Sequence, residues 1–244
     1  MKRAAIVTGA TGGIGEAIVK RLVADGCHVI ATDIREDGAS VLPGDVDYVR
    51  LDLLNTPDVS PIFDRLGARH LDYLVNAAGV ALFDRDGSVL DIRDNVWEKT
   101  LGVNLHGLRR MLIGAVPRLR KGRGKSIVNI ASIAGTRGMD SPLDAYQISK
   151  AAVVSLSRSL ALQLGPERIR CNAVCPGAIL TPMIAGLYEH SPDRRIAMEQ
   201  RTPLRRLGGP EEIASAVAFL LSDDASFVTA TELIVDGGWS AQIK

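Results

Sequence analysis

Two side chains that could move a proton, Tyr146 and Lys150, stand four residues apart in a segment whose apolar pattern predicts a helix over Ala145–Leu164. Side chains at this spacing share one helix face and can meet. A phenol beside an ammonium can act as an acid or a base near neutral pH if the phenol pKa falls from about 10 toward 7. A tyrosine that only packs on its own helix is the alternative at this point.

Two more polar residues extend this candidate site. Ser132 directly follows a predicted strand, Ser126–Ala131, at the sheet edge where α/β proteins place their ligands. Its hydroxyl could hydrogen-bond a substrate oxygen. Asn104 lies at an apolar level of a long predicted helix, Trp97–Arg118, where it is either a site amide or a core asparagine bonded to a backbone carbonyl.

A glycine-rich turn joins the first predicted strand, Ala4–Thr8, to a predicted helix, Ile14–Ala24. Such glycines allow a tight turn and a close backbone approach to a pyrophosphate, which the N–H groups at the helix start then stabilise. The spacing between Gly9 and Gly13 is wider than in the common dinucleotide fingerprint, and no Gly-Lys-Ser/Thr sequence indicates a nucleoside-triphosphate loop. A dinucleotide site is therefore predicted, with a plain turn as the alternative.

Asp33 ends the second predicted strand, about twenty residues beyond the glycines, where a carboxylate can accept hydrogen bonds from ribose hydroxyls. Its charge would repel a 2′-phosphate. Arg35 could accommodate that phosphate, but residue 34 is Ile and residue 12 is Gly rather than basic. These residues favour NAD over NADP as the cofactor, and a capping or turn aspartate is the alternative.

Short Val- and Ile-rich runs alternate with helical patterns over the whole chain, which predicts an α/β fold of βαβ units around a parallel sheet. The predicted strands are Ala4–Thr8, His28–Thr32, Tyr48–Leu51, Tyr73–Asn76, Ser126–Ala131, Arg170–Val174 and Leu233–Val235, and the helices are Ile14–Ala24, Trp97–Arg118, Ala145–Leu164 and Pro210–Leu221. No linker divides the chain, so residues 1–244 are expected to form a single dinucleotide-binding and catalytic domain. Two segments are expected to be irregular, Ile34–Asp47 and Pro182–Gly209, and residues 182–209 are predicted to form a substrate lid.

Composition excludes several classes of protein. The 244 residues carry a formal net charge of +1, which argues against a nucleic-acid partner. The longest uncharged stretch, Cys171–Tyr188, is broken by prolines and glycines and is expected to be a loop rather than a membrane span. The odd set Cys27, Cys171 and Cys175 predicts reduced, buried thiols in a cytoplasmic protein, and neither the cysteines nor the four histidines have metal-ligand spacing. No metal is assigned.

Taken in order along the chain, these motifs resemble the short-chain dehydrogenase/reductase family in its form of roughly 250 residues. The resemblance rests on Thr8-Gly9-(three residues)-Gly13-Ile14-Gly15, Asn76-Ala77-Ala78-Gly79, Asn104, Ser132, Tyr146-(three residues)-Lys150, Pro176-Gly177 and the C-terminal Val235-Asp236-Gly237-Gly238. It implies a Rossmann-like, doubly wound parallel sheet of seven strands flanked by helices.

The resemblance also implies a catalytic tetrad of Asn104, Ser132, Tyr146 and Lys150. Tyr146 would take the hydroxyl proton while hydride passes to the nicotinamide, and Ser132 would position the substrate oxygen. Lys150 would bind the nicotinamide ribose and lower the Tyr146 pKa, and Asn104 would hold a water that links Lys150 to solvent. A close Lys⁺ and an oxidised nicotinamide together could supply the roughly 4 kcal/mol that lowers a tyrosine pKa from about 10 toward 7.

By the same matching, Asp52 and Leu53 fall where the family contacts adenine, and Ile179 and Thr181 fall where it holds the nicotinamide carboxamide. The full predicted cofactor set is Gly9, Thr11, Gly12, Gly13, Ile14, Gly15, Asp33, Asp52, Leu53, Asn76, Ala77, Gly79, Tyr146, Lys150, Pro176, Gly177, Ile179 and Thr181. Two departures matter. Ala77 replaces a frequent family asparagine, and the segment after Asp33 is shorter than the usual crossover helix.

Residues expected to face the nicotinamide are mostly apolar, which predicts a neutral, largely hydrocarbon secondary alcohol or ketone as substrate. They are Ala81, Leu82, Phe83, Ile133, Ala134, Met139, Leu143, Ala178, Met183, Leu187 and Tyr188. An anion could instead pair with basic residues that are otherwise read as a solvated lid face, namely Arg137, Arg194, Arg195 and Arg201.

Three functions are weighed. The first is an NAD-dependent alcohol dehydrogenase; the second is an NADPH-dependent 3-ketoacyl thioester reductase, against which Asp33 argues. The third is a non-catalytic scaffold that senses redox state, for which loss of Tyr146 or Lys150 would be expected. Apolar residues on more than one face of the two long helices, together with the resemblance, predict a homotetramer.

Overall fold

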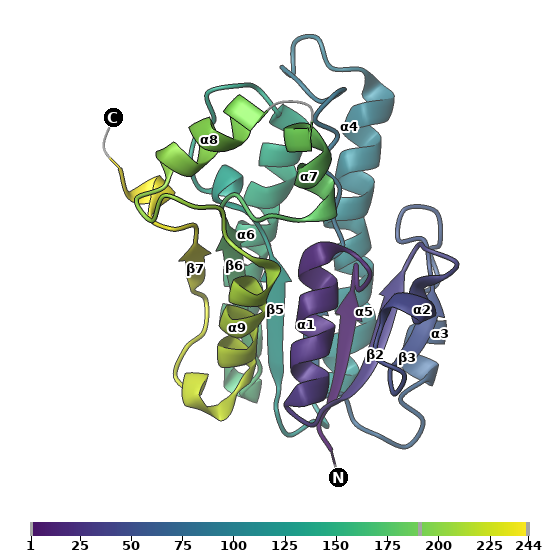
Figure 1. The fold of residues 1–244 in the computed structure, drawn as a ribbon. Helices are drawn as coiled ribbons and strands as arrows, with labels where there is room; N and C mark the ends of the chain where they lie inside the picture. The colour runs from purple at the N-terminus through teal and green to yellow at the C-terminus, as the bar shows by residue number, and fades with distance from the viewer. Residues whose placement is uncertain (1, 190–191, 243–244) are drawn as a thin grey trace.

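The computed structural model describes residues 2–189 and 192–242, and its centre is a seven-stranded, all-parallel sheet in the order β3-β2-β1-β4-β5-β6-β7 (Figure 1). The order reverses between β1 and β4, as in doubly wound folds. The strands are β1 (Ala4–Thr8), β2 (His28–Asp33), β3 (Asp47–Arg50), β4 (Tyr73–Asn76), β5 (Ser126–Ile130), β6 (Arg170–Pro176) and β7 (Glu232–Val235).

The strands are apolar on both sides because helices cover both faces of the sheet. Along β1, Ala4 and Ile6 belong to one hydrophobic core, whereas Ala5 and Val7 belong to the other. Because successive side chains of a strand point to opposite faces of the sheet, this one short strand contributes residues to both cores.

Helices α1 (Gly13–Ala24) and α9 (Pro210–Leu221) pack side by side on one face of the sheet, in front in Figure 1. The opposite face is covered by α5 (Leu108–Leu119) and α6 (Asp144–Leu164), and α4 (Asp94–Leu101) packs against α6 near the carboxyl edge of the sheet. The remaining α-helices are the short α2 (Gly38–Val41) and α3 (Ser60–Asp64), and α7 (Pro182–Glu189) and α8 (Pro192–Arg201).

The predicted seven-stranded α/β fold is confirmed, and each predicted strand is found with its ends within two residues of the expected ones. The segment after β2 contains only the four-residue α2, as its glycines and proline indicated. The prediction that Pro182–Gly209 is irregular is wrong for α7 and α8 and agrees with the structure over residues 202–209. The prolines and glycines of Cys171–Tyr188 indicated a loop, but Pro182 is the first residue of α7, as Pro192 is of α8, and proline is well tolerated at that position.

The long helix predicted over Trp97–Arg118 exists, but it is not a regular α-helix throughout. Between α4 and α5 lies a π-helical segment, η1 (Gly102–Gly107), so that the helical path runs without a break from Asp94 to Leu119. Such widened turns are rare and are frequently found at functional sites. Asn104 lies within this one.

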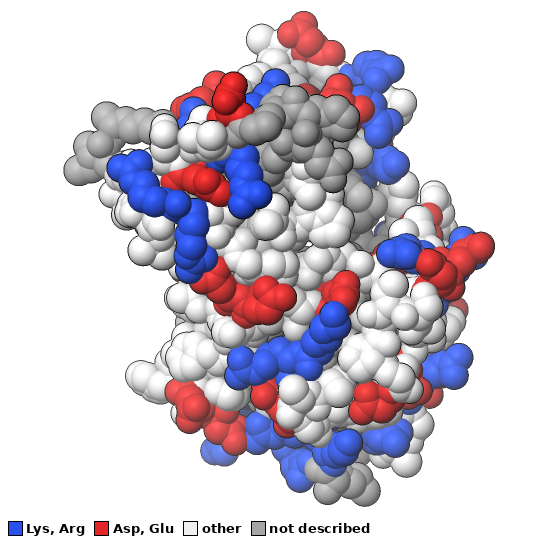
Figure 2. Space-filling model, in the orientation of Figure 1, with Lys and Arg blue, Asp and Glu red and all other residues white. Residues whose placement is uncertain are grey.

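The surface carries both signs of charge. Figure 2 shows Lys and Arg side chains interspersed with Asp and Glu over one face of the molecule. Among the described residues, no helix is both long and apolar enough to cross a membrane.

Candidate active site

The predicted catalytic residues meet where β5 and α6 adjoin, at the carboxyl edge of the sheet. Ser132 follows β5 and caps a single 3-10 turn, η2 (Ile133–Gly135), where its Oγ accepts the Ala134 N–H at 3.1 Å. The Ser132 hydroxyl also lies near enough to Tyr146 to lower the pKa of its phenol. The Lys150 Nζ lies 5.7 Å from the centroid of the Tyr146 ring. The structure therefore brings together a hydroxyl, a phenol and an ammonium.

Gly135 explains how Ser132 comes so close to α6. A Cβ at this position would lie 2.6 Å from the backbone carbonyl carbon of Lys150 and 2.7 Å from the nitrogen of Ala151. Real Cβ atoms do not approach backbone so closely, so only glycine lets η2 lie against the helix that carries Tyr146.

Burial has the largest effect on the pKa values of both Tyr146 and Lys150. Lys150 is only 5% exposed, and its Nζ donates a hydrogen bond to the Ile130 carbonyl at 2.9 Å. Loss of hydration lowers the pKa of this ammonium to about 8. Burial also raises the pKa of Tyr146, and the nearby Ser132 hydroxyl lowers it by less. The expected fall in the tyrosine pKa is therefore not produced by the protein alone.

Asn104 links the loop after β4 to α6. Its Oδ1 accepts the Val80 N–H at 2.8 Å, while its Nδ2 donates to the Val80 carbonyl at 3.0 Å and to Ser149 Oγ at 2.9 Å. Ser149 Oγ in turn donates to the Tyr146 carbonyl at 2.7 Å. Asn104 is thus both a core asparagine bonded to backbone and a neighbour of α6, the helix that carries Tyr146 and Lys150. The expected water at its side chain remains a prediction.

The glycine-rich turn has the geometry expected of a pyrophosphate-binding loop. Gly9 has φ +64°, and a Cβ there would lie 2.6 Å from Ala78. A Cβ at Gly15 would lie 1.9 Å from the Gly9 carbonyl oxygen, so the helix start and the turn are in direct contact. Thr8 Oγ1 accepts the Ala78 N–H at 3.1 Å and ties this turn to the one that follows β4. The other predicted residues of this segment, in the same turn and the first turn of α1, are Thr11, Gly12 and Ile14.

The Asp33 side chain lies against one side of the glycine-rich turn. One carboxylate oxygen accepts the Thr11 N–H at 3.0 Å and the other accepts the Ile34 N–H at 2.7 Å, which leaves further lone pairs for ribose hydroxyls. Arg35 is turned toward Asp37, with which its guanidinium makes two hydrogen bonds of 3.0 and 2.8 Å. The Asp33 carboxylate thus lies directly beside the glycine turn.

The remaining predicted cofactor residues after β4 and β6 lie around the same edge. A Cβ at Gly79 would lie 3.1 Å from Lys150 Nζ, and one at Gly13 would lie 3.0 Å from Thr181. A Cβ at Gly177 would lie 2.6 Å from the Cβ of Asp236. The other predicted residues of these two segments are Asn76 at the end of β4, Ala77 directly after it, Pro176 at the end of β6, and Ile179 beyond β6.

Asp52 and Leu53 have different environments, because the Asp52 side chain is hydrogen-bonded in a turn and the Leu53 side chain is buried in the core. The Asp52 carboxylate accepts the Leu54 N–H and an Asn55 side-chain N–H, both at 2.8 Å. Leu53 is buried in the hydrophobic core, where a Cβ at Gly107 would lie 2.9 Å from its own Cβ. The Leu53 side chain therefore packs in the core, and its carbonyl accepts a hydrogen bond from Arg110.

The basic residues of the predicted lid are partly engaged in ion pairs. Arg195 pairs with Glu199 at 2.9 Å and Arg201 pairs with Asp140 at 3.0 Å. These ion pairs agree with the prediction that the basic residues form a solvated face of the lid. The side chains of Leu187 and Tyr188, predicted to face the nicotinamide, lie outside the described part of the structure, as do residues 190 and 191 of the predicted lid.

The sequence analysis assigned no role to two residues that hold this site together, Asp86 and Ser149. Ser149 lies three residues after Tyr146, so helical spacing could have indicated it. Asp86 accepts hydrogen bonds from residues 59 and 60 positions away, and no local pattern signals such contacts. Thr8 belongs to the glycine-rich motif, but its contact with Ala78 was not predicted. Within the described residues, no group of three or more His, Cys, Asp or Glu is placed to hold a metal ion.

Comparison with known proteins agrees with this geometry. A family model described as Enoyl-(Acyl carrier protein) reductase matches residues 9–240. The 3-oxoacyl-(acyl-carrier-protein) reductase FabG of Thermotoga maritima is 34% identical over 242 residues, which cover 96% of each chain. The chain belongs to the short-chain dehydrogenase/reductase family. It is an oxidoreductase of that family, which acts on alcohol or ketone groups with a nicotinamide cofactor.

Two further comparisons show how varied this family is. The 3beta-hydroxysteroid dehydrogenase 2 of Eggerthella lenta is 36% identical over 249 residues, covering 97% of this chain and 94% of that one. The solved structure of a single-residue variant of actinorhodin polyketide ketoreductase with NADPH has a TM-score of 0.90 and 32% identity, covering 99% of this chain and 98% of that one.

The buried ammonium gives a pH-dependent stability prediction. Because the folded-state pKa of Lys150 lies near 8, below its unfolded value of 10.5, its charge destabilises the fold below pH 8, and this cost disappears as the pH rises toward 10.5. Lys150→Met removes the titration. We expect the stability of this variant relative to wild type to fall by about 3 kcal/mol between pH 7 and pH 10.5, measured by urea unfolding.

The control is Lys121→Met, at an exposed position, whose stability difference from wild type should not change with pH in this range. A Lys150→Met difference that is constant with pH would contradict the burial argument.

Proposed function

We propose that this family member is an NAD-dependent dehydrogenase that transfers hydride between NAD and a neutral, largely apolar secondary alcohol or ketone. The observation that carries the proposal is the meeting of Ser132, Tyr146 and Lys150 at the sheet edge, beside the glycine turn closed by Asp33. One edge of one sheet thus holds a proton-transfer group and a dinucleotide cradle.

The proposed steps follow from the side chains. In the oxidation direction, the Tyr146 phenolate accepts the hydroxyl proton of the substrate, and Ser132 hydrogen-bonds the same oxygen as it becomes a carbonyl. Lys150, held by the Ile130 carbonyl, keeps a positive charge near the phenol and is placed to bind the nicotinamide ribose. The cofactor, when bound, accepts the hydride at its nicotinamide ring.

Tyr146 becomes a base only if its pKa falls, and burial in the protein alone raises that pKa. A positive charge next to the phenol lowers it. The oxidised cofactor, when bound, and Lys150 would together supply this positive charge. Proton abstraction is in this way tied to cofactor occupancy, because the free protein keeps the phenol neutral.

The choice of NAD rests on Asp33 and on the pairing of Arg35 with Asp37. A carboxylate at the ribose disfavours a 2′-phosphate, and an arginine held by its own aspartate is less available to bind one. The alternative is an NADPH-dependent 3-ketoacyl thioester reductase. It is favoured by the similarity to FabG and to a ketoreductase solved with NADPH. A non-catalytic sensing scaffold has the least support, since Tyr146 and Lys150 are both present.

Substrate entry is assigned to residues 182–209, which include α7 and α8, as a lid over the sheet edge. Thr181, just before this segment, lies against Gly13 of the pyrophosphate loop, so the segment adjoins the cofactor site.

The cytoplasm is the proposed compartment. Cys27, Cys171 and Cys175 are free and buried, and burial raises the pKa of Cys171 to about 12 and that of Cys175 to about 11, which suits unreactive thiols.

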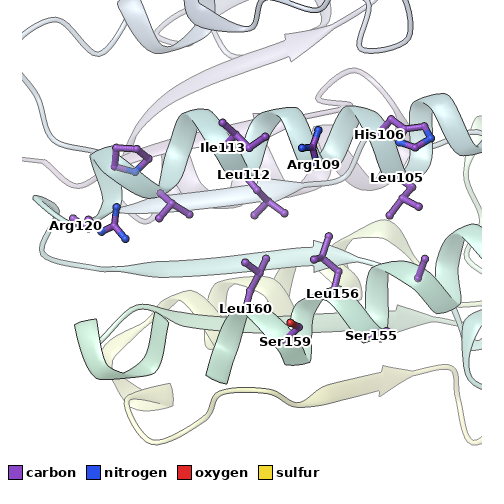
Figure 3. A pocket seen from close by; sticks show the side chains of 13 residues that line it. Leu105, His106, Arg109, Leu112, Ile113, Arg120, Ser155, Leu156, Ser159 and Leu160 are labelled. Carbon is purple, nitrogen blue, oxygen red and sulfur yellow. The ribbon is translucent and has the colours of Figure 1, made fainter. Parts of the chain in front are cut away.

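A homotetramer is proposed from an apolar groove on the far side of the catalytic helix. Figure 3 shows Leu112 of α5 opposite Leu156 and Leu160 of α6 across this groove, whose volume is about 780 Å³ and whose lining also includes Ile113. Apolar helix faces of this kind commonly pack against a symmetry-related copy. The groove is distinct from the catalytic edge, because it lies between the outward surfaces of the two helices.

The proposed reaction is tested by measuring the turnover of wild type and of the Tyr146→Phe variant. Wild-type protein should reduce NAD⁺ with at least one member of a panel of secondary alcohols, cyclic diols, steroids and hydroxyacyl thioesters, followed by the absorbance of the reduced nicotinamide. Tyr146→Phe should lower kcat by about a thousandfold while NAD⁺ binding, measured by calorimetry, is retained. A Tyr146→Phe variant with wild-type kcat would exclude Tyr146 as the base. If only thioesters react, the alternative reductase is supported.

Cofactor choice is tested at Asp33. Removing its charge in Asp33→Ser should raise the ratio of kcat/KM for NADP⁺ to that for NAD⁺ by about tenfold or more, because repulsion of the 2′-phosphate is lost. Glu36→Ser, which removes an exposed carboxylate three residues away, is the matched control and should leave the ratio unchanged. A wild-type preference for NADP⁺ would contradict the NAD assignment.

Assembly is tested by light scattering at micromolar concentration, where wild type should have the mass of a tetramer. Leu160→Arg places a charge in the groove and should give a smaller species, whereas Leu90→Arg, at a leucine that is 87% exposed, should not. A monomeric wild type would show the homotetramer to be wrong.

A further inference from the structure

The first turn of the catalytic helix α6 is capped by a distant loop rather than by its own sequence. The residue before the helix is Leu143, whose side chain has no hydrogen-bonding atom. The Asp144 N–H donates to the Gly87 carbonyl at 3.0 Å, and the N–H groups of Ala145 and Tyr146 donate to the two carboxylate oxygens of Asp86 at 3.2 and 2.9 Å. The opening N–H groups of a helix have no partner within it, so Gly87 and Asp86 satisfy three of them.

The contact runs in both directions. The Asp144 carboxylate accepts the Val89 N–H at 2.8 Å, so each segment caps the other. Asp86 is only 9% exposed and also accepts the Gly87 N–H at 2.8 Å. Its own backbone is fixed by a turn in which the Asp86 N–H donates to the Leu82 carbonyl at 2.7 Å. The carboxylate is thus held in place at the positive end of the helix dipole.

The loop that supplies Asp86 also borders the reacting groups. It leaves β4 through Gly79, which lies beside Lys150, and at Val80 it is bonded in both directions to Asn104. It is therefore fixed to the site at two points, Val80 and Asp86. Between them lie three residues that the sequence analysis expects to face the nicotinamide, namely Ala81, Leu82 and Phe83.

We propose that Asp86 is a positioning residue for Tyr146, which couples the substrate-side loop to the backbone of the catalytic base. The proposal rests on the proposed function for its effect on the reaction. Truncation of Asp86 would remove the acceptor of three N–H groups, those of Gly87, Ala145 and Tyr146 itself. Loss of such a bond frays a helix end, and a displacement of about 1 Å at a catalytic group can cost about a hundredfold in rate.

The experiment compares Asp86→Ala, Asp86→Asn and Asp84→Ala with wild type well below their unfolding temperatures. Asp84→Ala is the matched control, since Asp84 lies two residues away and its side chain is 77% exposed, where it pairs with Arg85 at 3.4 Å. Amide hydrogen exchange is measured for the peptide of residues 143–150, and kcat and KM are measured with the alcohol that wild type oxidises.

We expect Asp86→Ala to speed exchange in this peptide by about tenfold or more and to lower kcat by about ten- to a hundredfold, with KM for NAD⁺ unchanged. Asp86→Asn keeps one of the two oxygens and should lie between Asp86→Ala and wild type, and Asp84→Ala should match wild type. If Asp86→Ala does not fold, Asp86→Asn supplies the comparison.

Unchanged exchange in the Asp86 variants would overturn the proposal, and so would faster exchange with an unchanged kcat, which is the signature of a purely structural cap. If wild type oxidised no alcohol and reduced no ketone, the proposed function would fail separately. The exchange comparison would then decide by itself whether Asp86 fixes the Tyr146 backbone.

Discussion

The burial of the Lys150 ammonium is the constraint on which the rest of the site depends. A charged group taken out of water is costly unless it is hydrogen-bonded, and the Ile130 carbonyl at the end of β5 supplies one such bond. The cost appears as a pKa lowered to about 8. A lysine left in water would not carry this cost, so the fold gives up stability to hold a cation beside a phenol.

The neighbouring contacts keep the phenol beside that cation. Gly135 lets the Ser132 turn touch α6, and Asn104 reaches Tyr146 through Ser149. Asp86 holds the first turn of the helix from the loop after β4. These contacts come from different segments of the chain that meet at one sheet edge. The protein parts of the site are therefore held in place, and what changes during the reaction is charge rather than position.

The residues that could be predicted from the sequence are those whose role depends on local spacing. The strands follow from short Val- and Ile-rich runs, and the pairing of Tyr146 with Lys150 follows from one helical turn. The π-helical turn at Asn104 could not be predicted, because one wider turn hardly alters an apolar pattern of helical period. Asp86 could not be found either, since its partners lie 59 and 60 residues away. The helices α7 and α8 were not predicted, and each begins with a proline, a residue that is usually unfavourable inside a helix.

The most direct test is an ultraviolet titration of the Tyr146 phenol, taken as the difference between wild type and Tyr146→Phe, with and without saturating NAD⁺. We predict that without the cofactor the pKa of Tyr146 lies above the usual value for a tyrosine, because burial opposes ionisation. With saturating NAD⁺ the pKa of Tyr146 should fall, since the added positive charge favours the phenolate. A Tyr146 pKa that is the same in both titrations would contradict this prediction.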